Sequence, residues 1–511
     1  MSRSSATADL PPEVAAAIAA HRFGLGEPHL QAVGRDAPGW LLAQVGPAEA
    51  QRGTDLPQGL EGLRRYAEML RQQRLLASQS GSAAPTAAGA MAGQEGASMA
   101  SPGNATAPEP PLAMRFRDLV QADVRARLAT AALSTRPFAE RLALFWANHF
   151  TISSAKGSAR GIVGTYEREA IRPHIAGNFE TLLRAAVLHA GMLRYLDNDN
   201  SAGPDSAVVR RLARRPREAG GAPPRVSGLN ENLAREVLEL HTLGVAGGGA
   251  AYGGWGGYTQ ADVTAFAAVL TGWRVPLREL AEGTAGPAAP GEPTCRFEAN
   301  WHQPGPKTVL GRPYAEGPAA LDALLHDLAV HPSTARFIAT KLARHFVADD
   351  PPPALVATLE ADFRRTGGDL PSLYRTLLLA PEAWSPQPAK LKTPEEFVIS
   401  SARLLQLGDR AFMRPPDGGV LQLGQRLQAA PSPAGWPDRA EEWLGPDAVW
   451  KRVEWATRVA ALQGRQVDAR ALARASLGPL LQETTQRQLD RAADGPQALA
   501  LLLLAPEFQR R

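Results

Sequence analysis

The chain has 511 residues and a mass of 54.3 kDa, a length that allows about three average domains or one large core with insertions. Apolar residues make up 44% and charged residues 21%, which excludes a chain that is disordered throughout. The net charge is only +4, and the arginines are scattered among acidic residues except at 210–217, so nucleic acid is not an expected partner. Because Cys295 is the single cysteine, disulfides within the chain and thiolate metal clusters are excluded, and a metal would need nitrogen and oxygen ligands.

The sequence predicts no membrane span. The longest apolar run near the end of the chain, 498–505, is far shorter than the roughly 20 residues needed to cross a bilayer. In the first residues, Asp9, Pro11, Pro12 and Glu13 interrupt the apolar segment that a secretion signal requires. The chain as written is therefore expected in the cytoplasm.

Helical periodicity dominates the sequence. Apolar residues recur at spacings of three and four in nearly every ordered stretch, whereas alternating strand patterns are scarce. The predicted fold class is all-α: a multi-helix globular body with long Gly- and Pro-rich loops and disordered insertions. The helices predicted in chain order are 135–150, 166–175, 178–196, 227–243, one opening at 259, 319–330, 332–346, 352–365, 370–379, 394–407, 447–462 and a terminal pair within 468–504.

Two of these helices have clear end signals. The helix 227–243 is followed by Gly244, the residue type that commonly ends a helix in the left-handed conformation. Thr259, with Asp262 three residues later, forms a capping box that opens the next helix.

Composition divides the chain into segments. We expect an N-terminal helical segment at 1–76, a disordered linker at 77–111, a main helical body at 112–410 that carries a polar site, and a C-terminal helical segment at 411–511 that packs on it. The main body is expected to contain insertions at 202–226 and 280–293. The glycine-rich stretch 244–257 is expected to be a mobile loop.

The motifs of several enzyme classes are absent from the sequence. The segment 305–308 resembles the end of a P-loop, but Pro306 removes a backbone N–H that would hold phosphate. The sequence contains neither H-E-x-x-H nor G-x-S-x-G, and no strand pattern precedes the glycine-rich loop. Familiar hydrolase, kinase and dehydrogenase classes therefore lose support.

The strongest polar pattern is the helix at 230–244. Asn232, Glu236 and Glu239 lie within about 60° of one another around a regular helix, apart from the apolar stripe. Two carboxylates and an amide on one face suit a divalent cation or an acid–base pair. The alternative is an ordinary amphipathic helix with a solvated face, in which Arg235 pairs with Glu231 or Glu239.

Other polar residues admit both a functional and a structural interpretation. His149 lies on an apolar face and is expected to be buried, either as a hydrogen-bonded core histidine or as a ligand, and for His345 the core interpretation is favoured. The run 197–200 is explained by turn capping or by cation binding. The Pro-fixed loop 301–307 carries a His and a Lys that suit either role. His241 lies about 180° from Asn232 and cannot join its cluster in a regular helix.

Ordered motifs along almost the whole chain resemble the bacterial domain-of-unknown-function 1800 family. They run from 21–24 to 506–508 and include 145–150 (FWANHF), 172–174, 196–198, 230–244 (NENLAREVLELHTLG), 257–260 with Asp262, 270–273, 306–308, 331–332, 390–394 and 435–437. The resemblance implies a helical protein and no established reaction. Members of the family are often exported, so the resemblance leaves a periplasmic location as an alternative to the cytoplasm. Their genes lie beside those of proteins that resemble a sulfatase-like family, domain of unknown function 1501, which implies a protein partner. Gln303 stands where the family has Asp after His, so no carboxylate role is carried to it.

These observations lead to one functional hypothesis, a metal-assisted hydrolase-like enzyme with a single polar cavity. Its catalytic residues would be Glu236, Glu239 and His149, and a divalent cation would be bound by Glu236, Glu239, His149 and Asp197. Its substrate-binding residues would be Asn148, Asn198, Asn230, Asn232, His241, Gln260, His302 and Lys307. The alternative is a non-enzymatic helical scaffold or maturation partner of a neighbouring-gene, sulfatase-like protein, with the polar residues forming a buried network.

Overall fold

The computed structural model describes residues 7, 9–54, 56, 59–79, 116–214, 228–244, 257–284 and 294–511. Within these residues helices dominate, and the only strands form two short antiparallel pairs, β1 (Trp273–Arg274) with β2 (Arg296–Phe297) and β3 (Lys307–Val309) with β4 (Arg312–Tyr314). The all-α prediction is confirmed. In the described part of the chain, no helix has the length and apolar character that crossing a membrane would require.

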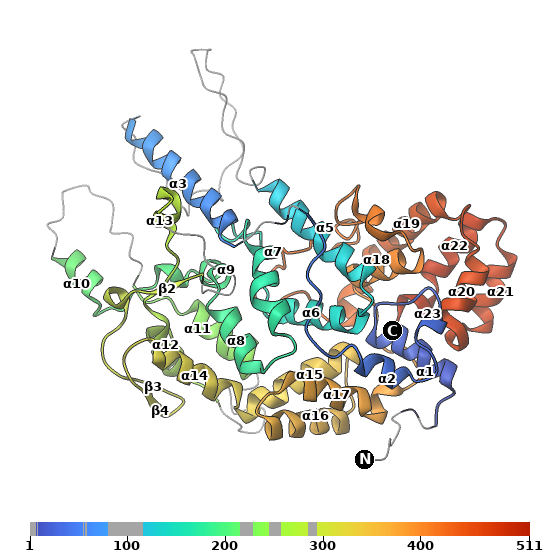
Figure 1. Ribbon diagram of the computed structural model, residues 1–511, viewed down its shortest axis with the longest axis horizontal. Helices are drawn as coiled ribbons and strands as arrows, with labels where there is room; N and C mark the ends of the chain where they lie inside the picture. Colours follow the sequence, from blue (N-terminus) through green and yellow to red (C-terminus); the bar gives the residue numbers. More distant parts are fainter. Residues whose placement is uncertain are drawn as a thin grey trace, which may run out of the picture.

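The N-terminal half contributes short helices and irregular turns (Figure 1). Its α-helices are α1 (Pro12–Ile18), α2 (Ala37–Leu42), α3 (Glu61–Gln79), α5 (Arg117–Leu133), α6 (Pro137–His149), α7 (Val163–Tyr166), α8 (Phe179–Val187), α9 (Ala190–Tyr195), α10 (Ala207–Ala213), α11 (Asn232–Glu236) and α12 (Gln260–Leu270). Its π-helical turns are η1 (Ala19–Phe23), η4 (Glu167–Ile171) and η7 (Val237–Thr242). The predicted capping box of Thr259 and Asp262 opens α12, and Gly244 has φ of 82°, as expected.

Further helices follow in the second half. They are α13 (Leu277–Glu282), α14 (Ala319–Ala329), α15 (Pro332–Phe346), α16 (Pro353–Thr366), α17 (Leu370–Leu379), α18 (Pro394–Leu404), α19 (Pro446–Gln463), α20 (Ala469–Leu477), α21 (Glu483–Arg491), α22 (Gly495–Leu504) and α23 (Pro506–Gln509). The predicted helices 332–346 and 370–379 coincide with α15 and α17. Their bounds are sharp because Pro332 occupies the first turn of α15 and the Asp369 side chain caps α17.

Two predicted helices are wrong in extent. The segment 178–196 divides into α8 and α9, because His189 is extended, with ψ of 139°, and its ring accepts a hydrogen bond from the amide of Gly191. The terminal pair within 468–504 is three helices, α20 to α22, because Gly478 ends α20 with φ of 52° and Ala492 ends α21 in an extended conformation. In both cases a short non-helical segment interrupts an apolar pattern that continues across it.

The expected insertions are described only in part. Residues 207–213 differ from the prediction because they form α10, whose first turn is capped by the Ser206 hydroxyl. The rest of the 202–226 insertion, from 215 on, lies outside the described residues, as do 80–111 of the predicted linker, 245–256 of the glycine-rich loop and 285–293 of the third insertion.

Two hydrophobic cores organise the described residues. The larger core contains side chains of α1, α2, α6, α8, α9, α12 and α14 to α17. The second core joins α5 and α18 to α19, α20, α21 and α22, which gather at one end of the molecule in Figure 1. Because Phe397 and Ile399 of α18 lie in the second core, this core crosses the expected boundary at residue 410. The four-part division of the chain stays a prediction.

A π-helical turn changes the register of the helix that carries the strongest sequence motif. In η7 the backbone hydrogen bonds span five residues, so each side chain after Glu236 is rotated relative to a regular α-helix. His241 is consequently fully buried, with its ring centroid 6.1 Å from that of His149 and 5.1 Å from that of Phe150. The angular positions predicted for a regular helix therefore do not apply beyond residue 236.

Candidate functional site: a cavity between helices α6, α15 and α18

A cavity of about 300 Å³ lies among α6, α15, the start of α18 and the segment 425–442. Helix α6 contributes Asn148 and His149, and α15 contributes Lys341, Arg344 and His345. The remaining polar residues that line the cavity are Arg127, Thr151, Tyr166, Glu167, Thr393, Glu395, Glu396, Gln425, Gln428, Trp436, Asp438, Arg439 and Glu442. The cavity thus collects groups from six parts of the chain: α5, α6 with the residues that follow it, α7 with η4, α15, the start of α18 and the segment 425–442.

Helix α15 presents three basic side chains to the cavity from one face. Lys341, Arg344 and His345 are spaced by three and four residues, which places them on adjacent turns of the same side. The adjacent side of the helix, next to His345, buries Ile338, Leu342 and Phe346 in the larger core. An amphipathic helix therefore fixes the positions of these three side chains rigidly.

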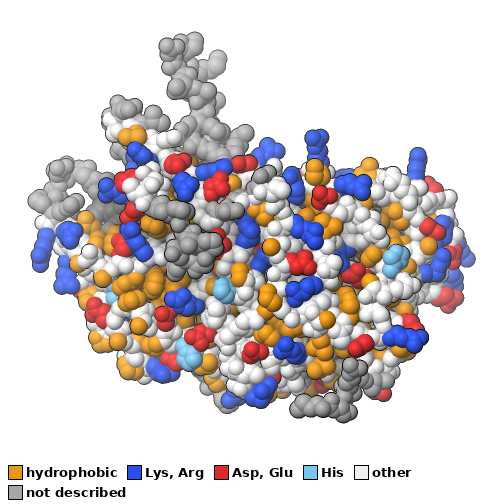
Figure 2. All heavy atoms as spheres, in the orientation of Figure 1, with side chains coloured by type: hydrophobic (Ala, Val, Ile, Leu, Met, Phe, Trp, Pro, Cys, Tyr) orange, Lys and Arg blue, Asp and Glu red, His pale blue; other side chains and the backbone are white. Residues whose placement is uncertain are grey.

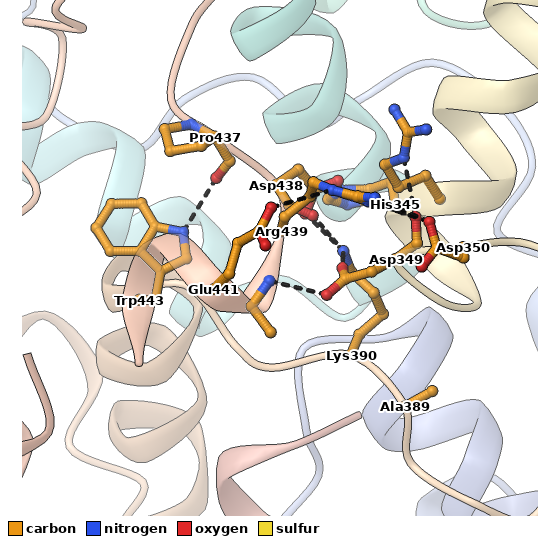
Figure 3. A network of polar contacts seen from close by, with 12 residues as sticks. His345, Asp349, Asp350, Ala389, Lys390, Pro437, Asp438, Arg439, Glu441 and Trp443 are labelled. Atoms are coloured by element: carbon orange, nitrogen blue, oxygen red, sulfur yellow. Dashed lines mark hydrogen bonds and ion pairs between the residues drawn. The ribbon is translucent and has the colours of Figure 1, made fainter. Parts of the chain in front are cut away.

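His345 and Asp438 form an oriented pair at the cavity wall (Figure 3). The His345 Nδ1–H donates to Oδ2 of Asp438 at 2.9 Å, which leaves Nε2 as the proton-accepting nitrogen. Asp438 is in turn held by Lys390, whose ammonium lies 3.4 Å from Oδ1 and also pairs with Asp349. The neighbouring cations keep the pKa of Asp438 well below its usual value, so this carboxylate stays ionised.

The segment that carries Asp438 is positioned by Asn148. The Asn148 amide donates from Nδ2 to the carbonyl of Trp436 at 2.9 Å and accepts from the amide of Trp436 at 2.8 Å. Gly435 makes this approach feasible, because it has φ of 85° and a Cβ placed there would lie 2.5 Å from the carbonyl oxygen of Asn148. Both polar groups of the Asn148 side chain are thus committed to the protein, unlike the substrate-binding role predicted for it.

Several buried polar atoms on the cavity wall have no partner within the described residues. They are Nδ1 of His149, Nε2 of His345, Nε1 of Trp436 and both amide atoms of Gln428. Gln428 also has φ of 54°, a strained conformation for a residue other than glycine. Because buried donors and acceptors are nearly always satisfied, this concentration of unpartnered atoms makes the cavity the candidate functional site.

The inner wall of the cavity is an ionic network. Arg127 donates to Glu167 at 2.6 Å and to Glu395 through two nitrogens, at 2.5 and 3.2 Å. Glu396 binds Arg141 and also Arg511, whose Nη2 lies 2.9 Å from Oε1. Although burial opposes ionisation of Glu396, the two guanidinium groups lower its pKa to about 2. These carboxylates are therefore charged and fully engaged.

Lys341 differs from these groups because no carboxylate lies within 4 Å of its amine in the described residues. Its Nζ lies 5.5 Å from the ring centroid of Phe337. Burial and the nearby Arg344 lower its pKa to about 8, against the opposing effect of Asp438. Lys341 is thus a cation without a counterion on the wall of the cavity.

His149, predicted to be catalytic and a metal ligand, is buried on this wall as expected from its apolar face. Its Nε2–H donates to the carbonyl of His241 at 3.2 Å, and its ring packs on Trp146 and Phe150. Burial, together with Lys341 and His241, lowers the pKa of His149 well below its usual value, so the ring is neutral. Burial likewise lowers the pKa of His241 to about 3.

Glu236 and Glu239 do not line the cavity. Both are half-buried, and burial together with the nearby Glu239 raises the pKa of Tyr258. Burial and the charge of Glu239 raise the pKa of Glu236, and Glu236 in turn contributes to the raised pKa of Tyr195, about 12. These carboxylates form a separate cluster with tyrosines, and no hydrogen bond or ion pair joins them to His149.

The polar residues at the start of this helix are also separate from the cavity. Asn232 is exposed, and its backbone N–H donates to Oδ1 of Asn230 at 2.9 Å. Gln260 is exposed and bridges Glu231, at 2.7 Å, to Arg235, at 2.9 Å. The Arg235–Glu231 pair weighed from the sequence is present at 3.4 Å. These residues join α11 to α12 at the surface.

Asp197 and Asn198 lie in a third location. Asp197 has φ of 59° and pairs with Lys156, whereas Asn198 is buried and donates to the carbonyl of Leu270 at 3.1 Å. His302 and Lys307 form a fourth group at the β3 hairpin: the His302 Nδ1–H donates to the carbonyl of Thr271 at 2.8 Å, and its Nε2 accepts from Lys307 at 2.9 Å. His302 and Lys307 are thus satisfied by each other and by the local backbone, whereas Oδ1 of Asn198 has no partner among the described residues.

The predicted single cavity is therefore not assembled from the predicted residues. Only Asn148 and His149 reach the cavity, and the metal set of Glu236, Glu239, His149 and Asp197 is spread over three locations. Among the described residues, no three His, Cys, Asp or Glu side chains lie close enough together to bind a metal ion. The expectation of a divalent cation at these four residues thus has no geometric support.

The sequence analysis did not single out the residues that face the cavity from α15 and from 425–442. His345 was interpreted as a core histidine because it lies beside Ile338 and Leu342 on its helix, and its partner, Asp438, is 93 residues away along the chain. A signal was nevertheless present, since the family-like motifs at 390–394 and 435–437 directly include or adjoin Lys390, Glu395 and Asp438. Lys341 carries no local signal other than its helical spacing from His345.

Comparisons with known proteins identify the family. The family model described as "Protein of unknown function (DUF1800)" matches residues 18–510, nearly the whole chain. The chain therefore belongs to this family, as its motifs indicated. No curated protein and no solved structure matches the chain.

Proposed function

We propose that this member of the DUF1800 family is an enzyme that binds a small polar molecule in the α6–α15–α18 cavity and transforms it by acid–base catalysis, with His345 as the proton-transfer group. One observation carries the proposal. His345 is oriented by the 2.9 Å hydrogen bond to Asp438, and its buried Nε2, without a partner in the described residues, belongs to a side chain on the cavity wall. Asp438 fixes the tautomer and stabilises the protonated ring.

Hydrolysis is the reaction class we assign to this arrangement. Nε2 of His345 would accept a proton from a water molecule as the water oxygen attacks the electrophilic centre of the substrate. The imidazolium would then return that proton to the leaving group, so the ring ends each cycle neutral. Burial lowers the pKa of His345, which keeps the ring in the neutral, basic form at neutral pH. Water and substrate are the only reactants that this proposal requires.

The alternative of a scaffold or maturation partner requires a broad exposed apolar patch. In the described residues, the large exposed apolar side chains come from many different segments: Leu75, Leu133, Val330, Leu379, Met413, Leu421, Leu444, Val449, Trp450 and Leu462. On the face shown in Figure 2, apolar, basic and acidic side chains are intermixed. The concave polar site therefore favours an enzyme, and a protein partner of the sulfatase-like family stays a prediction from the family resemblance.

The test is a hydrolysis screen with p-nitrophenyl esters, anilides and phosphate esters of small acids. For any substrate that is turned over, we expect His345→Gln to lower kcat/KM by about 10²–10⁴-fold, the contribution of a positioned acid–base group. His326→Gln is the matched control, because His326 is an exposed histidine of α14 that also pairs with a carboxylate, Glu180, at 2.8 Å. Equal activity of His345→Gln and the control would refute the assignment.

A further inference from the structure

The buried carboxylates on the cavity wall are already neutralised by the protein. Arg127 serves Glu167 and Glu395, Glu396 is bound by Arg141 and Arg511, and Asp438 is bound by His345 and Lys390. The remaining acid of the wall, Glu442, is exposed to solvent. The inner wall therefore has no spare negative charge to offer a cationic ligand.

Two cations on the same wall are left without a carboxylate. Lys341 and Arg344 lie three residues apart on α15, and neither forms an ion pair within 4 Å in the part of the chain that the structure describes. Arg344 uses Nε to donate to the carbonyl of Asp349 at 3.1 Å, and Lys341 faces the ring of Phe337. A half-buried cation without a counterion is unfavourable unless an anion joins it.

Neutral donors on the wall add to this positive character. The indole Nε1–H of Trp436 and the amide Nε2 of Gln428 are buried and have no acceptor among the described residues. Both side chains line the same cavity as Lys341 and Arg344. An anion with several oxygen atoms would satisfy the ammonium, the guanidinium and these N–H groups together.

We infer that the ligand of this cavity is an anion, a carboxylate or a phosphate, which Lys341 and Arg344 recognise and to which Trp436 and Gln428 donate hydrogen bonds. This inference rests on the proposed function and names its substrate class. A cavity of about 300 Å³ lies at the small end of ligand sites, so the anion belongs to a molecule of metabolite size. Lys341 and Arg344 are binding residues in this account, and His345 remains the proton-transfer group.

The inference is tested by isothermal titration of the full-length protein with malonate, with inorganic phosphate and with malonamide, the neutral isostere of malonate. We expect malonate or phosphate to bind and malonamide to bind at least tenfold more weakly. Binding of malonate alone identifies a carboxylate and binding of phosphate alone identifies a phosphate, and either supports the inference. Equal affinity for malonamide, or no binding of either anion at millimolar concentration, overturns it.

Substitutions at Lys341 and Arg344 test whether the anion binds at these two residues. Lys341→Met and Arg344→Gln are each expected to weaken anion binding at least tenfold, whereas Lys341→Arg, which keeps the charge, retains most of the affinity. Lys451→Met is the control, because Lys451 is a half-buried lysine of α19 that already has a counterion, Asp447, at 2.5 Å. A thermal melt of each variant verifies folding. Unchanged affinity in both folded Lys341→Met and folded Arg344→Gln overturns the inference.

The pH dependence adds an independent readout. Lys341 is surrounded by His149 of α6, His241 of η7, Asp438 of the 425–442 segment and Arg344 of its own helix, and both buried histidines are neutral. A cation and a fully ionised ligand are both required for binding. Malonate affinity should therefore stay constant from about pH 6.5, where malonate is a dianion, up to the Lys341 pKa of about 8, and should fall above it. The fall should be absent in Lys341→Arg. An affinity that rises between about pH 7 and 9 contradicts the inference.

Failure of this inference is distinguishable from failure of the proposed function. His345→Gln should bind malonate or phosphate with the affinity of the unaltered protein and lose only turnover. An active enzyme whose ligand is neutral would overturn the anion inference and leave the role of His345 intact.

Discussion

His345 gains its chemistry from Asp438, a residue that lies outside its own helix. The carboxylate raises the pKa of the ring against the stronger effect of burial and restricts the proton to Nδ1. Periodicity predicts which face of a helix is buried, and for His149 and His345 that prediction of burial is confirmed. Periodicity does not predict a partner 93 residues away, so the pairing of His345 with Asp438 could not be predicted from the sequence.

This pairing predicts the behaviour of Asp438→Asn. Loss of the carboxylate charge should lower the pKa of His345 further, and because the neutral ring is the base, the acid limb of the kcat/KM profile should move to lower pH. The maximum should fall by about 10²-fold or more, since the tautomer is no longer fixed. A pH–rate profile of the variant measures both effects. An acid limb that moves to higher pH would show that another group limits the rate.

At the scale of elements, the sequence predicted helices well where a capping residue or proline fixes their ends. α15 and α17 were predicted with their observed bounds for this reason. The π-helical turn η7 was not predicted, because a wider turn leaves no distinct apolar spacing, and it moved His241 toward His149. The loop 425–442 was not predicted as a wall because its shape depends on positive-φ glycines and on contacts with α6.

A substitution at Gly435 tests whether the segment 425–442 depends on its close contact with α6. In Gly435→Ala, the Cβ would combine left-handed strain with a 2.5 Å contact to the carbonyl of Asn148, so we expect destabilisation of about 2–4 kcal/mol and displacement of Asp438. Gly424→Ala is the matched control. Gly424, directly before this segment, has φ of 96°, but a Cβ added there would meet open space. Urea unfolding compares the two variants. Equal destabilisation would mean that strain alone, without the Asn148 contact, accounts for Gly435.

At the scale of the molecule, the buried ionic network connects the two hydrophobic cores. Glu396 of α18, whose neighbours lie in the second core, binds Arg141 of α6 and Arg511. The all-α class was predictable because the local spacing of apolar residues indicates helices along the chain. The cavity could not be predicted, because it forms where α6, α15, α18 and 425–442 meet. Contacts between segments so far apart leave no local pattern in the sequence.

Removal of the network's central carboxylate should therefore destabilise the whole fold. Glu396→Gln leaves Arg141 and Arg511 buried without their counterion, so we expect a loss of about 3–5 kcal/mol in the free energy of unfolding. Glu441→Gln, an exposed carboxylate 3.5 Å from Arg439, should change it by less than about 0.5 kcal/mol. Guanidinium chloride unfolding gives both values. A small effect of Glu396→Gln would show that the network contributes little to stability.

The same carboxylate predicts an acid dependence. The pKa of Glu396 falls from 4.5 to about 2 on folding, so its contribution to stability is fully present above pH 4.5 and is lost as the pH falls toward 2. The melting temperature should therefore decline between these values, and the decline should be shallower in Glu396→Gln. Identical acid profiles for the two proteins would place the sensitive group elsewhere.

The measurement that tests the account most directly is a crystallographic screen in which small anions and their neutral isosteres are soaked into crystals of the full-length protein. The account predicts electron density for anions inside the cavity, with oxygen atoms at hydrogen-bonding distance from Lys341 and with His345 on the same wall. A cavity that stays free of every fragment while fragments bind reproducibly beside Glu236 and Glu239 would contradict it.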